Sequence, residues 1–470
     1  MNSVEGKLSQ QLAELKGIAY VEAAAGCGKT FKIAEAISFA SSGPQLVLTH
    51  THAGVASLRK KLRDLGVSCK YYYVDTIDGW CQRLSAAFPS VSGFKDDCNW
   101  PEMRQATINV LKHPFISKLI LETYQGLYVD EYQDCNLLQH QIILNLAEIM
   151  PCRIFGDPLQ SIFTFDKEAP AISWKNDVVG KIPKLAELTT PWRWKLQGGN
   201  EKLGNWITTI RQKLLQNESI NISGAPISHF ENSFPEKLRV CKNHLGEKGT
   251  VVAITKLPND GRFLAGRLGG TYQSMEEMEC KRLISFASKF SKSTGAMRAL
   301  VLIDFVEECF SNTSTIFKQI KGNLEKGKSI ISRSEKQDIQ KACEAIQLLL
   351  ENDSLEILLP VLKMIETIKT INLYSKELWG EAKKMVDAYN SNQHENLIDA
   401  AKEARAQTRI FGRKPEYRTV STILLIKGLE FDHAIVLIPD DLNANELYVA
   451  LSRARKSVAV LSNNNQLPLI

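Results

Sequence analysis

The 470-residue sequence lacks any long apolar run and any closely paired cysteines. A membrane-spanning helix needs about 20 consecutive apolar residues, and no segment approaches that length. The first residues, Met1 to Gly6, lack the basic and apolar regions of a secretory signal peptide. The ten cysteines are scattered without a C-x-x-C pair, which disfavours both a disulfide framework and a zinc site. We therefore expect a cytoplasmic protein with no membrane partner.

A strong charge imbalance is lacking as well. The formal net charge is +6, with 44% hydrophobic and 23% charged residues, which is typical of globular proteins. Such a charge permits a nucleic-acid partner without requiring one. The length allows two to four domains, each with its own core.

What the sequence does contain is a glycine-rich turn between an apolar run, Ile18 to Val21, and a helix-like segment that starts at Phe31. A turn of this kind points backbone N–H groups inward, where a polyphosphate can lie. Lys29 can then reach the β- and γ-phosphates, and the Thr30 hydroxyl can hold Mg²⁺. The usual pattern begins with Gly where this sequence has Ala23, so a plain small-residue turn is the alternative. The predicted nucleotide-binding residues are Ala25, Gly26, Cys27, Gly28, Lys29, Thr30 and Phe31.

A second apolar stretch, Leu127 to Val129, ends in two carboxylates, Asp130 and Glu131. This is the form expected of a neighbouring strand in the same parallel sheet. Asp130 would bind Mg²⁺, and Glu131 would orient and deprotonate the attacking water. An ordinary solvated strand end is the alternative for the pair on its own.

Short apolar strands alternate with helical segments along most of the chain, which predicts an α/β fold with parallel sheets. Leu185 to Thr190 and Ile423 to Leu425 are among the strands expected in a second α/β unit. Two helical stretches interrupt the alternation. The predicted division is 1–185 for the first core with a small helical insertion at about 78–123, 186–274 and 417–470 for the second core, and 275–416 for a helical accessory insertion.

Further motifs follow in a specific order. They are Asp130-Glu131-Tyr132-Gln133-Asp134, Gly156-Asp157-Pro158-Leu159-Gln160, Trp192-Arg193-Trp194, Lys427-Gly428-Leu429-Glu430-Phe431 and Tyr448-Val449-Ala450-Leu451-Ser452-Arg453. Together with the glycine loop, this series closely resembles the UvrD/Rep/PcrA group of superfamily 1 helicases over nearly the whole chain. The resemblance implies two RecA-like parallel-sheet domains, each with a mainly helical insertion, and ATP with Mg²⁺ in the cleft between them.

The resemblance also implies roles for side chains outside the loop. Arg193 and Arg453 look like the two arginine fingers that neutralise charge on the γ-phosphate. Gln160 looks like the γ-phosphate sensor. Trp192 stands where the family packs an aromatic ring on adenine, with core packing as the rival interpretation. The remaining nucleotide contacts implied are Glu430 near the ribose and Gln11, or its neighbour Gln10, at the adenine.

Several residues resemble the family's contacts to single-stranded nucleic acid, and aromatic side chains there would support bases. They are Thr49, His50, Thr51, His52, Thr76, Phe163 and Phe165. Asp78 replaces a usual His and would repel phosphate if it pointed inward. Plain core packing is the alternative for Phe165. A basic and aromatic segment from Arg405 to Arg418 would either grip duplex phosphates or form a solvated helix face.

The function expected from the resemblance is an ATP-dependent DNA helicase or translocase, moving 3′ to 5′, in DNA repair or anti-phage defence. The alternative is an ATPase subunit that senses DNA or nucleotide and regulates a partner nuclease with little unwinding. The compact chain suits this alternative and is similar to the UvrD-like subunit of Gabija-type defence systems.

Overall fold

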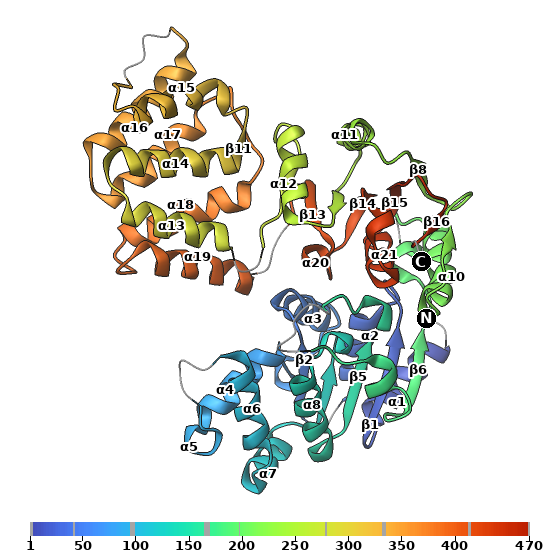
Figure 1. Ribbon diagram of the computed structural model, residues 1–470. Helices are drawn as coiled ribbons and strands as arrows, with labels where there is room; N and C mark the ends of the chain where they lie inside the picture. Colours follow the sequence, from blue (N-terminus) through green and yellow to red (C-terminus); the bar gives the residue numbers. More distant parts are fainter. Residues whose placement is uncertain are drawn as a thin grey trace.

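The computed structural model describes residues 3–40, 43–94, 99–163, 170–196, 198–277, 280–330, 335–411 and 415–468, without the side chains of 3–6 and 407–411. Two six-stranded parallel sheets form the framework, and helical insertions extend from each (Figure 1). The predicted α/β fold with two RecA-like domains is confirmed.

The central strands β2, β4 and β5 of the first sheet are buried along their whole length. The order of this sheet is β3-β2-β4-β5-β1-β6, and every pairing is parallel. Along β2, Leu46 and Leu48 face one apolar cluster while Val47 faces the other, as expected when helices cover both sides of a sheet. The bounds are β1 Ile18–Ala23, β2 Gln45–Thr49, β3 Tyr72–Thr76, β4 Gly126–Val129, β5 Cys152–Gly156 and β6 Lys184–Leu188, with helices α1 Ser3–Glu14, α2 Lys29–Ser38, α3 His52–Asp64 and α8 Leu137–Ile149.

The sequence-based prediction placed one strand, β6, in the wrong sheet. The stretch from Leu185 was expected to open the second α/β unit, but β6 pairs in parallel with β1 at the edge of the first sheet. Strand alternation reports that a segment is extended without saying which neighbour it pairs with. The chain crosses to the second sheet only after Leu188.

The second sheet repeats the architecture, with the order β10-β13-β9-β14-β15-β8 and parallel pairing throughout. Val252 and Ile254 of β9 face one apolar cluster, and Val251 and Ala253 face the other. The bounds are β8 Ser228–Phe230, β9 Val251–Thr255, β10 Gln273–Ser274, β13 Arg418–Thr422, β14 Phe431–Val436 and β15 Ala454–Leu461, with helices α9 Trp192–Lys195, α10 Glu201–Leu215, α11 Phe234–Asn243, α12 Pro258–Arg267 and α21 Ala444–Leu451.

The expected strand from Ile423 to Leu425 is wrong. The strand at this place is β13, and Ile423–Ile426 forms a short helix, α20. Ile423 and Ile426 are buried three residues apart, while Leu424 is 40% exposed. A four-residue apolar run fits a strand and a buried helical turn equally well, so the run alone does not decide between them.

Both insertions are mainly helical, and the second also contains a two-stranded antiparallel sheet of β11 Phe310–Ser311 and β12 Asn372–Leu373. The first carries α4 Ile77–Ala87, α5 Pro89–Ser92, α6 Trp100–Leu111 and α7 Pro114–Thr123, and the second carries α13 Lys281–Lys292, α14 Gly295–Cys309, α15 Ser314–Glu325, α16 Gln337–Glu351, α17 Leu358–Glu366, α18 Lys376–Asn390 and α19 Leu397–Phe411. The second insertion has its own apolar core, in which the rings of Phe286 and Phe305 stack 3.9 Å apart. No helix in the described part of the chain is long and apolar enough to cross a bilayer.

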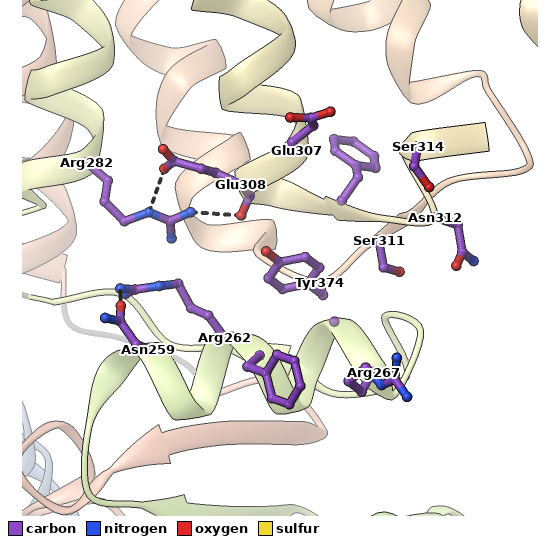
Figure 2. A pocket seen from close by; sticks show the side chains of 13 residues that line it. Asn259, Arg262, Arg267, Arg282, Glu307, Glu308, Ser311, Asn312, Ser314 and Tyr374 are labelled. Atoms are coloured by element: carbon purple, nitrogen blue, oxygen red, sulfur yellow. Dashed lines mark hydrogen bonds and ion pairs between the residues drawn. The ribbon is translucent and has the colours of Figure 1, made fainter. Parts of the chain in front are cut away.

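A groove of about 690 Å³ lies between α12 and the second insertion (Figure 2). Arg262 and Arg267 line it from α12, and Tyr374 lines it from the insertion. Arg282 Nε lies 2.9 Å from Glu308 Oε2 within it. The residues that line this groove include none of those assigned from the sequence to nucleotide or nucleic acid.

Candidate active site

The glycine-rich turn connects β1 to α2 at the carboxyl edge of the first sheet. Gly26 and Gly28 have φ values of 69° and 81°, which lie in the left-handed region that favours glycine. A Cβ atom on Gly26 would lie 2.7 Å from the Trp194 ring, so packing also requires glycine there. The first turn of α2 carries no acidic residue. The N-terminus of α2 is therefore electrostatically suited to an anion.

Four predicted residues meet beneath this turn. Lys29 Nζ lies 2.7 Å from Glu131 Oε1 and 3.6 Å from Asp130 Oδ1. The Thr30 hydroxyl donates to Asp130 Oδ2 at 3.5 Å. The pair Asp130 and Glu131 directly follows β4, two strands away from β1 in the sheet. The structure thus brings the predicted lysine, hydroxyl and both carboxylates together.

Glu131 is held in an unusual backbone conformation, with φ 56° and ψ 39°. Such a conformation is costly for a residue other than glycine and is concentrated at functional sites. Gln133 Nε2 donates to Glu131 Oε2 at 2.5 Å. Burial opposes ionisation of Glu131, but the charges of Lys29 and Lys427 outweigh it and lower the pKa. Burial raises the pKa of Asp130, so Glu131 is the more readily ionised of the two carboxyls.

Two arginines approach from the second sheet. Arg193 Nη2 lies 2.7 Å from Glu430 Oε1, and its backbone N–H donates to the Gly26 carbonyl at 3.0 Å. Its buried Nε atom has no hydrogen-bond acceptor among the described residues. Arg453 is buried beside Gln160, and burial together with Arg193 lowers its pKa to about 10. The predicted arginines and Glu430 therefore lie on the wall that faces the glycine turn.

Gln160 lies between the two walls. It ends a short 3₁₀ turn after β5, and its Nε2 atom donates to Asp157 Oδ2 at 2.9 Å. Arg453 Nη2 lies 3.5 Å from Gln160 Oε1. A movement of either sheet therefore changes the surroundings of this amide.

Two residues were predicted to contact the base, Trp192 and Gln11, and of these Trp192 lies against the glycine turn. The Trp192 ring lies against the turn, because a Cβ atom on Gly28 would be 3.2 Å from Trp192 Cδ1. Trp192 remains 39% exposed, which leaves ring surface open. Gln11 is exposed on α1, and its neighbour Gln10 donates to Glu14 Oε1 on the same helix at 2.9 Å.

The predicted nucleic-acid residues that the structure describes lie at or just after the carboxyl ends of β2, β3 and β5. Thr51 and Thr76 cap α3 and α4, and each hydroxyl accepts a backbone N–H at 3.0 Å. Thr49 is buried, His52 is exposed, and burial lowers the pKa of His50 to about 4. Because the strands are parallel, these residues share one edge of the sheet.

The predicted base-stacking aromatics are only partly described. Phe163 is 41% exposed, and Lys427 Nζ lies 4.7 Å from its ring centroid. Phe165 lies outside the described residues. The Phe163 ring is therefore partly exposed, with Lys427 over its face.

One charge expectation needs correction. Asp78 does not present a bare charge to phosphate, because Arg104 Nε and Nη2 donate to its two oxygens at 2.8 and 2.7 Å. At the two ends of the basic and aromatic segment, Arg405 is buried with Glu377 and Glu381, and Arg418 donates to backbone carbonyls. The side chains of residues 407–414 lie outside the described part of the chain. Long arginine side chains that look available in a sequence are used here to satisfy buried acceptors.

Three further residues join the site without a role in the sequence analysis. Lys427 donates to Asp134 and to the Gln160 carbonyl, and the Tyr448 hydroxyl accepts the Ala25 N–H at 3.0 Å. Both lie within motifs that the sequence analysis had singled out. Arg211 makes ion pairs with carboxylates near the turn, and no motif contains it.

The comparisons with known proteins can be set beside this geometry. Residues 95–173 match the UvrD/REP helicase N-terminal domain, a segment that contains Asp130, Glu131 and Gln160. No curated protein matches the chain. The narrower likeness to a Gabija-type subunit has no support in these comparisons.

Two solved structures show remote similarity. The arterivirus nonstructural protein 10 helicase with DNA is 11% identical with a TM-score of 0.36; the match covers 97% of this chain and 63% of that one. The Pif1 helicase from Bacteroides in complex with ADP-AlF3 and ssDNA is 13% identical with a TM-score of 0.38; the match covers 99% of this chain and 92% of that one. Similarity at this level carries no inference about individual residues.

Proposed function

Since this chain belongs with the UvrD-like proteins of helicase superfamily 1, we propose that it is an ATP-dependent DNA helicase or translocase. One observation carries the proposal. Lys29 and the carboxylates of the first sheet lie opposite Arg193 and Arg453 of the second, with Gln160 between them. A triphosphate held there would touch both domains at once.

The residues of the first wall suit phosphate and magnesium. The backbone N–H groups of the turn and the Lys29 ammonium would bind the β- and γ-phosphates. Mg²⁺, whose bound form neutralises charge on the transferred phosphoryl group, fits the Thr30 hydroxyl and the Asp130 carboxylate. No group of three or more His, Cys, Asp or Glu side chains in the described ranges is arranged to hold a metal. Phosphate and water would therefore complete the magnesium shell.

The second wall supplies the charge that the reaction needs. Glu131 of the first wall, ionised because of Lys29, would take a proton from the attacking water, and the arginines of the second wall would face the charge that develops on the γ-phosphate. Arg193 and Arg453 would exchange their present acceptors, Glu430 and Gln160, for oxygens of the γ-phosphate. Arginine fingers of this type contribute roughly 10³- to 10⁵-fold to the rate.

Loss of the γ-phosphate would release these contacts and let the two sheets separate. We assign the first core to the chain through β6 at Leu188, the second core to the sheet from β8 to β15, and the accessory insertion to α13–α19. Phe163 and the residues from Thr49 to His52 form the proposed track for single-stranded DNA. Repeated closure and opening would then move the strand, in the 3′-to-5′ direction by resemblance to the family.

A strand-displacement assay tests the function. The purified chain should hydrolyse ATP faster with single-stranded DNA, and the stimulation should weaken as salt rises. It should displace a strand from a 3′-tailed duplex and not from a 5′-tailed one. Displacement from the 5′-tailed duplex alone would show that the chain moves in the 5′-to-3′ direction, opposite to the one proposed. Hydrolysis without displacement on either substrate would favour the regulatory ATPase, which predicts co-purification with a nuclease.

A further inference from the structure

A buried arginine, Arg211, lies among three carboxylates behind the glycine turn. Its Nη2 atom lies 2.6 Å from Glu22 Oε1 and 3.2 Å from Asp157 Oδ1, and its Nη1 atom lies 3.3 Å from Glu187 Oε1. Arg211 is 2% exposed and Asp157 is fully buried. Glu22, Asp157 and Glu187 are far apart in the sequence, so only the folded chain brings them together around Arg211.

The cluster joins the two halves of the fold. Arg211 lies on α10, whose Leu203, Ile207 and Leu214 pack into the apolar core of the second sheet. The carboxylates belong to the first sheet, on β1, after β5 and on β6. Figure 1 shows α10 next to β6, where the chain passes from one sheet to the other. The arginine thus reaches across the junction between the sheets.

Burial of the Arg211–Asp157 ion pair is not explained by stability. A buried ion pair is often no more stabilising than apolar residues of similar volume, because its desolvation is costly. Burial opposes the charge of Arg211, yet Asp157 and Glu22 raise its pKa, so the guanidinium stays ionised. Ion pairs of this kind constrain position in a way that apolar contacts do not.

Asp157 links this cluster to the side-chain amides of Gln160 and Gln133. Its Oδ2 atom accepts from Gln160 Nε2 at 2.9 Å. Its backbone N–H donates to Gln133 Oε1 at 3.0 Å, and Gln133 in turn donates to Glu131. The position of Asp157 therefore sets the geometry of the proposed sensor and supports that of the proposed base.

We propose that Arg211 is a positioning residue for hydrolysis, which holds the Asp157 carboxylate from the second core so that Gln160 faces Arg453. The proposal rests on the proposed ATPase function. Arg211 itself touches none of the reacting atoms. Its removal should therefore lower the catalytic rate while nucleotide binding persists.

A double-mutant cycle separates positioning from a structural effect. The variants are Arg211→Met, Gln160→Ala and their combination, with kcat, KM for ATP, the Kd of a fluorescent ADP analogue and Tm measured for each. Arg211→Met should lower kcat at least tenfold and change the ADP Kd less than threefold. In the Gln160→Ala background it should lower kcat less than twofold further, because both changes disable the same amide. Arg211→Lys should restore part of the rate.

The chain offers a matched control in Arg405, which is 3% exposed and also pairs with two carboxylates, but in the accessory insertion. Arg405→Met should lower Tm while kcat stays within twofold of wild type. The proposal would be overturned if the fold-losses in kcat of Arg211→Met and Gln160→Ala multiplied in the double variant. Equal kcat for Arg211→Met and Arg405→Met would also overturn it.

A second variant covers loss of folding. If Arg211→Met does not fold, the isosteric Asp157→Asn replaces it in the same cycle, with the same expected and contrary outcomes. An inactive wild-type chain would instead reject the proposed function. An active wild type with an unaffected Arg211→Met rejects only the positioning role.

Discussion

The two parallel sheets share an architecture but present different chemistry to the cleft between them. The first sheet meets the cleft at the carboxyl ends of β1 and β4, where a backbone turn and two carboxylates lie. The second meets it at the amino ends of β14 and β15, next to Glu430 and Arg453. On the first sheet, backbone N–H groups of the glycine turn would bind a phosphate. On the second, the long side chains of Arg193 and Arg453 would exchange their present acceptors for phosphate oxygens. Two sheets of the same architecture can thus separate phosphate binding from neutralisation of the charge on the γ-phosphate.

The largest effect should come from breaking the first wall. Lys29→Ala removes the only ammonium that reaches both carboxylates among the described residues and leaves Glu131 and Asp130 facing the phosphates. We expect turnover to fall below detection and nucleotide binding to weaken, measured by ATPase assay and by titration with a fluorescent ADP analogue. Lys32→Ala, next along α2, is the control, since Lys32 pairs with Glu35 on the same helix. Wild-type turnover in Lys29→Ala would remove the assignment of the binding wall.

A smaller loss should follow from breaking the second wall. Arg453→Ala should slow turnover by roughly 10³-fold or more while the ADP affinity changes little, because the finger acts on charge that develops at the γ-phosphate. Comparison of kcat with the ADP Kd gives the measurement. Arg455→Ala, two residues on, is the control, because Arg455 pairs with Asp432 away from the glycine turn. If Arg453→Ala weakens ADP binding as strongly as it slows turnover, the two walls do not differ in the proposed way.

Glu131→Gln tests the chemistry within the first wall and should cost less than loss of the finger. The amide keeps the shape and a partner for Gln133 but cannot accept the proton of the attacking water. We expect kcat to fall by roughly 10²- to 10⁴-fold with ATP binding retained. Rapid-quench and equilibrium binding measurements separate the two quantities. Equal rates for Glu131→Gln and wild type would exclude this residue as the general base.

The same comparison explains what the sequence could predict. The glycine turn, Lys29 and the carboxylates of the first wall lie within ten residues of one another or at the end of an apolar strand, so their spacing reveals them. The arginines of the second wall were found only because whole motifs resemble those of a family. The positions of Arg193 and Arg453 in the sequence, taken without the surrounding motifs, do not indicate a catalytic role.

Contacts between distant segments escaped prediction for a physical reason. Arg104 of α6 pairs with Asp78 of α4. Arg211 forms ion pairs with carboxylates on β1, after β5 and on β6. No local periodicity encodes which buried charge meets which. The wrong sheet for β6 has the same origin, since strand propensity is local and strand pairing is not.

The smallest expected effect lies at the base rather than the phosphates. Trp192→Ala removes a ring that lies against Gly28 with much of its surface open. Stacking of an aromatic pair contributes about 0.5–1.5 kcal/mol, so the KM for ATP should rise about two- to twelvefold while kcat changes little. Trp100→Ala, at an exposed site on α6 in the first insertion, is the matched control. Inhibition by tripolyphosphate, which lacks a base, should be unchanged in Trp192→Ala. A variant that loses tripolyphosphate affinity as well would show that Trp192 supports the turn itself, and base recognition would then have to come from elsewhere in the cleft.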